Sequence, residues 1–252
     1  MPRKPTLSPT RISLYLECAL KYRYIYIDKI GRFYTRARPY YSLGSTLHQV
    51  LEGFHAEGGH ASAEEMAMDF EKRWISAGYE TIEQEAEYRL AGSEMVALYH
   101  RAAAVRSAEG ISTLLTERTL RMDFGEFTLM GRIDRVDRWP DGSLEIVDYK
   151  SGRMETSTEE IAGDLAMSIY QLLVRHQYPG SKVKATIYCL RTGSQASSEL
   201  NGAQVDEFIH DLRNLGQDIL QRDYESLSPE RIPACETCDF LRLCKKGFRE
   251  DE

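Results

Sequence analysis

The sequence predicts an α/β protein in which a mixed central sheet, built from about residues 112 to 190, is flanked by helices. Strand-like alternation recurs at Ser112–Asp123, Glu126–Met130 and Gly131–Gly152. A helical pattern at Glu159–His176 then leads to a further apolar strand at Lys182–Leu190. Helical patterns also precede and follow this block. Such an order is typical of a sheet covered by helices.

The first part of the chain is predicted to be a helical lobe. Met1–Leu7 looks like a loose basic arm, after which Ser8 and Pro9 provide a helix cap and first helical residue. Ser62 and Glu65 form a capping box for a later helix. The expected helices are Thr10–Ile27, Leu43–His55, Ser62–Ala77 and Glu80–Ser107, the last with an interruption at Gly92.

The stretch Gly131–Gly152 is predicted to be a β-hairpin. Trp139–Gly142 has the Pro and Gly positions of a type I turn. A three-residue loop there pairs Trp139 with Ser143 and, counted back, Asp134 with Asp148. Because side chains alternate along a strand, Lys150 shares a face with Asp148.

Two directly opposed carboxylates repel each other across a sheet, so Asp134 and Asp148 need an explanation. One interpretation is a solvated face on which water screens the repulsion. The other is a divalent cation held between the two carboxylates, with Lys150 beside it. Mg²⁺ takes one or two carboxylates and keeps waters for a phosphate substrate. The second interpretation predicts a site for phosphodiester hydrolysis.

The C-terminal part combines an amphipathic helix with a cysteine cluster. The helix is expected at Gly202–Arg222, and Cys235, Cys238 and Cys244 follow at C-x₂-C-x₅-C spacing. With Cys18 as fourth ligand, the cluster suits either zinc or an iron–sulfur cluster. Cys189 ends a strand and is treated as a small apolar residue.

Bulk composition limits the class of protein. With 252 residues, we expect one domain divided into an N-terminal lobe (1–110), a core (111–200) and a C-terminal region (201–252). A net charge of −7 argues against a protein that coats nucleic acid uniformly. The sequence shows no N-terminal signal and no apolar run of membrane-spanning length. We therefore expect a cytoplasmic protein that does not bind membranes.

The hairpin resembles a known family of enzymes. Asp134 followed by Asp148-Tyr149-Lys150 is similar to the D…(D/E)xK signature of PD-(D/E)XK nucleases, and the surrounding GRIDRVD and VDYKSG resemble the RecB-like branch. GSTLHQVLE resembles the Gly-x₃-His helix of that branch, with the histidine at His48. DLAMSIYQLL resembles its Gln-x₃-Tyr helix, in which Tyr170 matches but Ala166 occupies the Gln position.

The cysteines extend the resemblance. A Cys in the first helix together with the terminal C-x₂-C-x₅-C is similar to iron–sulfur nucleases, namely the AddB nuclease domain and the CRISPR-associated RecB-like exonucleases. This resemblance favours a 4Fe–4S cluster over Zn²⁺ at the cysteines. It implies a restriction-endonuclease-like core closed by an iron–sulfur cap that acts as a structural staple. The expected ligands are Cys18, Cys235, Cys238 and Cys244.

The resemblance also implies roles for residues of the core. His48, Asp134, Asp148 and the carbonyl of Tyr149 would bind Mg²⁺ or Mn²⁺, while Lys150 would position the nucleophile and Tyr170 would complete the catalytic set. Glu117 lies where the family often has an acidic residue, although a solvent-facing strand position explains it equally well. His55, on the same helix as His48, is given no role.

These expectations define a DNA exonuclease in DNA repair and recombination or in CRISPR adaptation, with a helicase or adaptation proteins as possible partners. One alternative is an inactive DNA-binding or assembly subunit that keeps the nuclease fold, which only Ala166 supports. Another is an iron–sulfur redox protein, in which the acidic hairpin and Lys150 would have no role.

Overall fold

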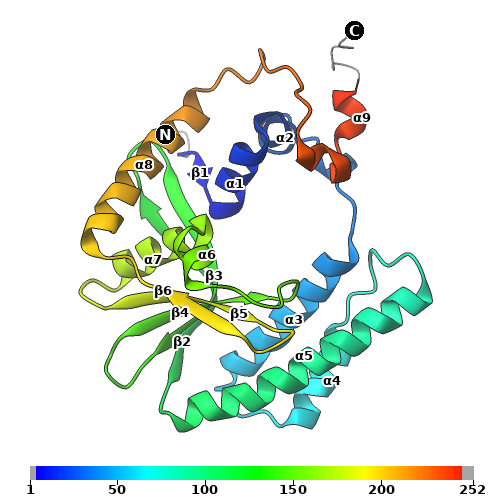
Figure 1. Ribbon diagram of the computed structural model, residues 1–252, viewed down its shortest axis with the longest axis vertical. Coiled ribbons are helices and arrows are strands. Elements are labelled where there is room, and N and C mark those ends of the chain that lie inside the picture. Colours follow the sequence, from blue (N-terminus) through cyan, green and yellow to red (C-terminus); the bar gives the residue numbers. More distant parts are fainter. Residues whose placement is uncertain (1–3, 246–252) are drawn as a thin grey trace. The chain divides into compact units, whose positions relative to one another are not determined.

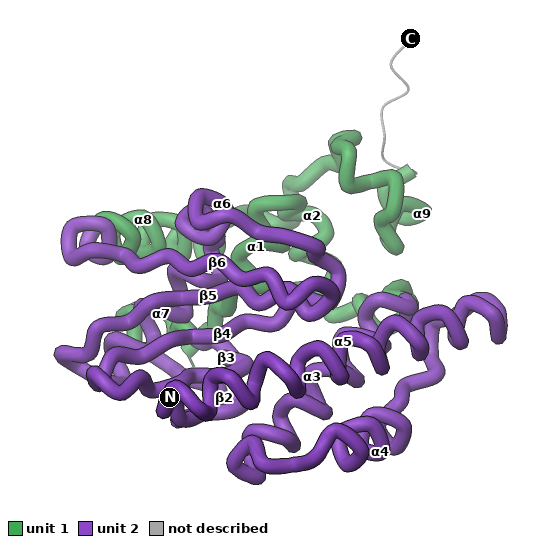
Figure 2. Tube along the Cα trace, turned by 60° about the horizontal axis from the view of Figure 1, so that its bottom comes forward, with its two compact units in different colours: residues 1–36, 123–129, 207–252 green, residues 37–122, 130–206 purple. Residues whose placement is uncertain are grey.

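The computed structural model describes residues 4–245, and these form two compact units. Unit 1 contains the described residues up to Arg36, Asp123–Leu129 and those from Glu207 onward. Unit 2 contains Ala37–Met122 and Met130–Asp206 (Figure 2). The expected division into 1–110, 111–200 and 201–252 stays a prediction.

A mixed sheet organises unit 2. Its central strand β4 runs antiparallel to β3 and parallel to β5, while β6 runs antiparallel to β5 and β2 also pairs with β3 (Figure 1). The predicted α/β class with a mixed sheet and flanking helices is therefore confirmed. The strands are β2 (Ser112–Asp123), β3 (Thr128–Arg138), β4 (Leu144–Lys150), β5 (Val183–Cys189) and β6 (Gln195–Ser198).

The hairpin between β3 and β4 has the predicted turn and register. The N–H of Trp139 donates to the carbonyl of Ser143 at 2.9 Å, and Gly142 has a φ of 84°. That left-handed backbone favours glycine because it has no Cβ. Pairing continues to Arg135 opposite Val147. The two strands that were expected before and within the hairpin are one continuous strand, β3.

Three helices of unit 2 pack on one another and on the sheet. They are α3 (Pro39–Ala56), α4 (Ala63–Arg73) and α5 (Ile82–Ala108). Their buried apolar side chains form one core with Val147 and Tyr149 of β4. Gly92 does not interrupt α5: a Cβ there would lie 2.7 Å from the Phe70 ring, so this glycine permits close helix packing.

The connection from β4 to β5 is also helical. The structure places α6 (Thr158–Ala162) and α7 (Leu165–Gln177) there, where the sequence predicted one helix. The break falls at Gly163 and Asp164, because Asp164 Oδ1 accepts hydrogen bonds from the N–H groups of Ala166 and Met167 and so caps a new helix. Helix α7 packs against β5.

Unit 1 begins with a short strand where a loose arm was expected. Strand β1 (Thr6–Leu7) runs parallel to Thr128–Leu129, the start of β3. The expected helix Thr10–Ile27 is instead three segments, with extended backbone at Cys18 between the first two. The segments are α1 (Pro9–Glu17), α2 (Ala19–Tyr22) and a π-helical turn at Arg23–Ile27, and a 3₁₀ turn follows at Gly31–Phe33.

Side chains join the two ends of the chain within unit 1. The Tyr15 hydroxyl donates to Asp218 Oδ2 at 2.5 Å, and the Tyr24 ring stacks on Phe240 with centroids 5.5 Å apart. Most of the helix α8 (Gly202–Gln221) belongs to this unit, with a 3₁₀ turn (Pro233–Thr237) and α9 (Leu241–Cys244) after it. No described helix has the length and apolar character needed to cross a bilayer.

We expect Gly216→Ala to destabilise the protein by about 1–3 kcal/mol, since a Cβ at Gly216 would lie 2.6 Å from Cζ of the buried Phe127 ring. Urea unfolding measures this change. Gly202→Ala on the same helix is the control, because no atom lies within 4 Å of its Cβ position. An equal effect of both substitutions would contradict the packing argument.

Candidate metal centre and cysteine cluster

Three side chains from α3, β2 and β3 converge in unit 2. Nδ1 of His48 lies 3.2 Å from Oε1 of Glu117 and 3.4 Å from Oδ1 of Asp134. One ligand atom from each residue lies within 4.8 Å of the other two. Nitrogen and carboxylate oxygens at this spacing suit a divalent cation of the first transition row or Mg²⁺.

Glu117 reaches this site through an unusual backbone conformation. Its φ is 43°, in the left-handed region that a non-glycine residue in a strand rarely adopts. Its side chain is only 7% exposed, and Oε2 lies 2.7 Å from Nε of Arg132. The interpretation of Glu117 as a solvent-facing strand residue is therefore wrong. Its place one strand before the D…DxK motif was the only signal for this position.

Asp134 is held by the neighbouring strand. Beyond the last regular pair, Arg135 with Val147, the N–H of Tyr149 donates to Oδ2 of Asp134 at 2.9 Å. The other carboxylate oxygen of Asp134, Oδ1, faces His48. The backbone of β4 thus orients the first acidic residue of the motif.

Asp148 and Lys150 lie next to this group of three. Asp148 is buried, and its Oδ2 is 2.6 Å from Nζ of Lys150. Burial, followed by the charge of Asp134, raises the pKa of Asp148 to about 6 against the opposing effect of Lys150. For Lys150, burial lowers the pKa, but Asp148 and Asp134 outweigh this and raise it.

The imidazole of His48 stands between two carboxylates. Burial by itself lowers the pKa of His48, but hydrogen bonds to Asp134 and Glu117 raise it to about 10. A protonated ring therefore supplies the positive charge that these carboxylates require. A divalent cation can supply the same charge, so the donor set fits the metal that the motif implies.

The structure places Tyr170 near the same carboxylates. Burial, then the charges of Asp148 and Asp134, raises its pKa. Its ring packs against Gly131, where a Cβ would lie 2.8 Å from the ring. The neighbouring Gln171 is buried and accepts a hydrogen bond from the N–H of Leu200, so it does not replace the glutamine missing at Ala166.

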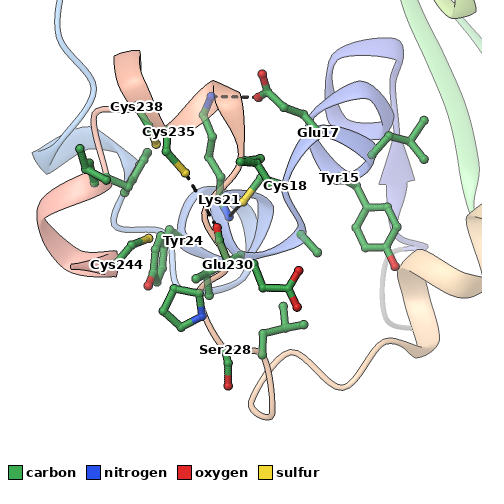
Figure 3. A pocket seen from close by; sticks show the side chains of 18 of the residues that line it. Tyr15, Glu17, Cys18, Lys21, Tyr24, Ser228, Glu230, Cys235, Cys238 and Cys244 are labelled. Carbon is green, nitrogen blue, oxygen red and sulfur yellow. Dashed lines mark hydrogen bonds and ion pairs between the residues drawn. The ribbon is translucent and has the colours of Figure 1, made fainter. Parts of the chain in front are cut away.

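The four expected cysteine ligands come together in unit 1. Cys18, Cys235, Cys238 and Cys244 line one cavity of about 370 Å³ (Figure 3). Burial raises the pKa of Cys244; a hydrogen bond with Tyr24 opposes this rise, and the nearby thiols of Cys238, Cys18 and Cys235 add to it. Cys189 is buried in β5 and does not line this cavity.

Cys18 occupies the break between α1 and α2. Its φ of −161° ends the first helix, and its sulfur accepts a hydrogen bond from the N–H of Lys21 at 3.4 Å, which caps the second. Four thiols around one cavity are a donor set that either zinc or an iron–sulfur cluster accepts.

Comparison with known proteins places the chain in a family. A family model described as the PD-(D/E)XK nuclease superfamily matches residues 6–245. Among solved structures, a candidate exonuclease from Eubacterium rectale shares 16% identity, with a TM-score of 0.58 over 98% of this chain and 90% of that one. The structure of SSO0001 shares 11% identity over 99% of this chain and 90% of that one, with a TM-score of 0.42. Curated proteins give no match.

The raised pKa of Asp148 predicts how the stability of the metal-free protein changes with pH. An unfolded aspartate has a pKa near 4, so the folded state retains this proton more strongly. Its contribution to stability is present below about pH 4 and is lost as the pH rises through about 6.

We therefore expect Asp148→Asn to reduce the loss of stability between pH 4 and pH 8 by about 1–3 kcal/mol. Urea unfolding in the presence of a chelator measures the difference. Glu94→Gln, at an exposed position of α5, should keep the wild-type profile. Identical profiles for Asp148→Asn and wild type would show that this carboxylate does not have a raised pKa.

Proposed function

Because this chain belongs to the PD-(D/E)XK nuclease superfamily, we propose that it is a metal-dependent DNA nuclease that degrades DNA from its ends. The convergence of His48, Glu117 and Asp134, with Asp148 and Lys150 beside them, supports this proposal most directly. The preference for an exonuclease rests on the RecB-like motifs. The description of the Eubacterium rectale protein agrees with it.

The residues proposed to hold Mg²⁺ or Mn²⁺ are His48, Asp134, Asp148 and the carbonyl of Tyr149. Glu117 is added to this set because its carboxylate lies within 4.8 Å of the ligand atoms of His48 and Asp134. A divalent cation bound there would polarise the phosphate and make a bound water more acidic. Tyr149 fits this set because its own N–H already binds Asp134. His48 must lose its proton before it can act as a ligand.

Lys150 has a separate role in the proposed reaction. Its ammonium group, 2.6 Å from Asp148, can orient the attacking water and offset negative charge that develops on the phosphate oxygens. Tyr170 lies near both aspartates and is proposed to hold the substrate or the water in place. Proton transfer from the water then requires a neighbouring carboxylate or bulk solvent.

We also propose a 4Fe–4S cluster at Cys18, Cys235, Cys238 and Cys244, with Zn²⁺ as the alternative occupant. The cavity that these four thiols line supports a shared ligand, and the resemblance to iron–sulfur nucleases favours the cluster. Four thiolates are the usual ligands of such a cluster. It would join segments at opposite ends of the sequence within unit 1 and so act as a structural staple.

The proposed biological setting is DNA repair and recombination or CRISPR adaptation, with a helicase or adaptation proteins as partners. This setting rests on the RecB-like and AddB-like resemblance alone. The second candidate function is an inactive DNA-binding subunit, which Ala166 favours because the family glutamine is missing. A time course with end-labelled single- and double-stranded DNA distinguishes the two.

We expect Lys150→Met to lower cleavage at least about 100-fold while DNA binding stays within about twofold, since the lysine acts on charge formed during the reaction. Lys72→Met, at an exposed position of α4, is the control. Single-turnover cleavage and a binding assay in Ca²⁺ measure the two effects. Full activity of Lys150→Met would refute the assigned role.

We expect Cys18→Ser to lose bound iron and visible absorbance. Its free energy of unfolding should fall by up to about 5 kcal/mol, because the cluster closes a long loop and so restricts the unfolded chain. Metal analysis and thermal unfolding measure both. Cys189→Ala should keep its iron because Cys189 lies outside the cavity. Purified protein that contains zinc and no iron would support the alternative occupant.

A further inference from the structure

A second polar cluster lies buried in unit 2, and it shares Tyr149 with the group of proposed metal ligands. Arg135 of β3 is 1% exposed. Its Nη1 lies 2.6 Å from Nε2 of His55 and 2.7 Å from the hydroxyl of Tyr149, and it also bonds to the hydroxyl of Tyr99. The cluster therefore joins α3, α5, β3 and β4 at one guanidinium group.

The protonation state of His55 follows from its partners. A guanidinium nitrogen can only donate, so Nε2 of His55 accepts the bond from Arg135 and the ring proton lies on Nδ1. Nδ1 lies 2.9 Å from Oγ1 of Thr113, which in turn donates to Oδ1 of Asp137. Burial and the charges of Arg135 and Arg106 lower the pKa of His55 to about 2. The imidazole is therefore a neutral link in a directional chain.

The charge of Arg135 is balanced inside the cluster. Its Nη2 lies 3.0 Å from Oδ2 of Asp137. Arg106 of α5 binds the same oxygen at 2.8 Å and reaches Oε2 of Glu145 at 2.6 Å. Because each buried charge has a partner, this network can hold its geometry without a ligand.

The cluster contacts the elements that carry the proposed metal ligands. Tyr149 stands between Asp148 and Lys150 in the sequence, and its N–H holds Asp134. His55 follows His48 on α3 by seven residues, which is two helical turns and therefore the same face. A shift of the Tyr149 ring or of α3 would thus move ligands on both sides of the metal site.

We propose that Arg135 is a positioning residue that sets the spacing of the metal ligands by fixing Tyr149 of β4 and His55 of α3. This inference rests on the proposed metal site. It gives a function to His55, Tyr99 and Thr113. Among the described residues, none of these three forms a direct hydrogen bond to His48, Asp134 or Asp148.

Two substitutions test the proposal without removing the buried arginine, whose loss would endanger folding. Tyr149→Phe removes only the hydroxyl that accepts a hydrogen bond from Arg135, and it keeps the backbone carbonyl and N–H. Thr113→Val removes the acceptor for His55 with little change in shape. Tyr188→Phe is the matched control, since Tyr188 pairs with Tyr149 in the sheet, is equally buried, and its hydroxyl has no hydrogen-bond partner among the described residues.

The measurement is Mn²⁺ binding to the full chain by calorimetry, together with kcat and KM for DNA. We expect Tyr149→Phe and Thr113→Val to weaken Mn²⁺ binding about 10–100-fold, as loss of residues behind metal ligands commonly does. We also expect a lower kcat, an unchanged KM for DNA, and recovery of kcat at high Mn²⁺. Tyr188→Phe should bind Mn²⁺ as the wild type does.

Wild-type Mn²⁺ affinity in both test variants would overturn the positioning role, and so would equal losses in Tyr149→Phe and Tyr188→Phe. Those outcomes leave the proposed nuclease function intact. Absence of Mn²⁺ binding by the wild-type protein would instead overturn the proposed metal site and this inference with it.

Discussion

Compensation of buried charge on β3 and β4 is the constraint on which the rest of unit 2 depends. Asp137 and Glu145 are buried, and Arg106 and Arg135 bind them at 2.6–3.0 Å. At the candidate metal centre, the carboxylates of Asp134, Asp148 and Glu117 are offset by His48, Lys150 and Arg132. Burial of carboxylates without such partners is unfavourable. The charge on His48 depends on a proton, which a divalent cation could replace.

The cost of burying the carboxylates at the candidate metal centre connects stability with function. The backbone strain at Glu117 and the raised pKa of Asp148 both lower the stability of the metal-free protein. Binding of a divalent cation would recover part of this free energy, because it binds the folded chain and not the unfolded one. In the proposed arrangement, the network around Arg135 would hold the metal ligands in place before an ion binds.

In unit 1, backbone and side-chain contacts place four cysteines around one cavity. The chain leaves helical geometry at Cys18, and the thiol then caps the next short helix. Tyr15 and Tyr24 contact residues near the other end of the sequence, Asp218 and Phe240. The four thiols line one cavity in the same unit, and a bound cluster would add a covalent link between segments that hydrogen bonds and ring stacking already join.

The sequence by itself determined the α/β class, the hairpin register and the superfamily, because strand periodicity, a Pro-Asp-Gly turn and the D…DxK spacing are local signals. It also brought Cys18 into one set with the terminal cysteines. Only the tertiary structure decided the place of Glu117 and the contacts of His55. Both depend on partners that are distant in the sequence: His48 and Arg132 for Glu117, and Arg135 for His55. Local patterns do not contain such contacts.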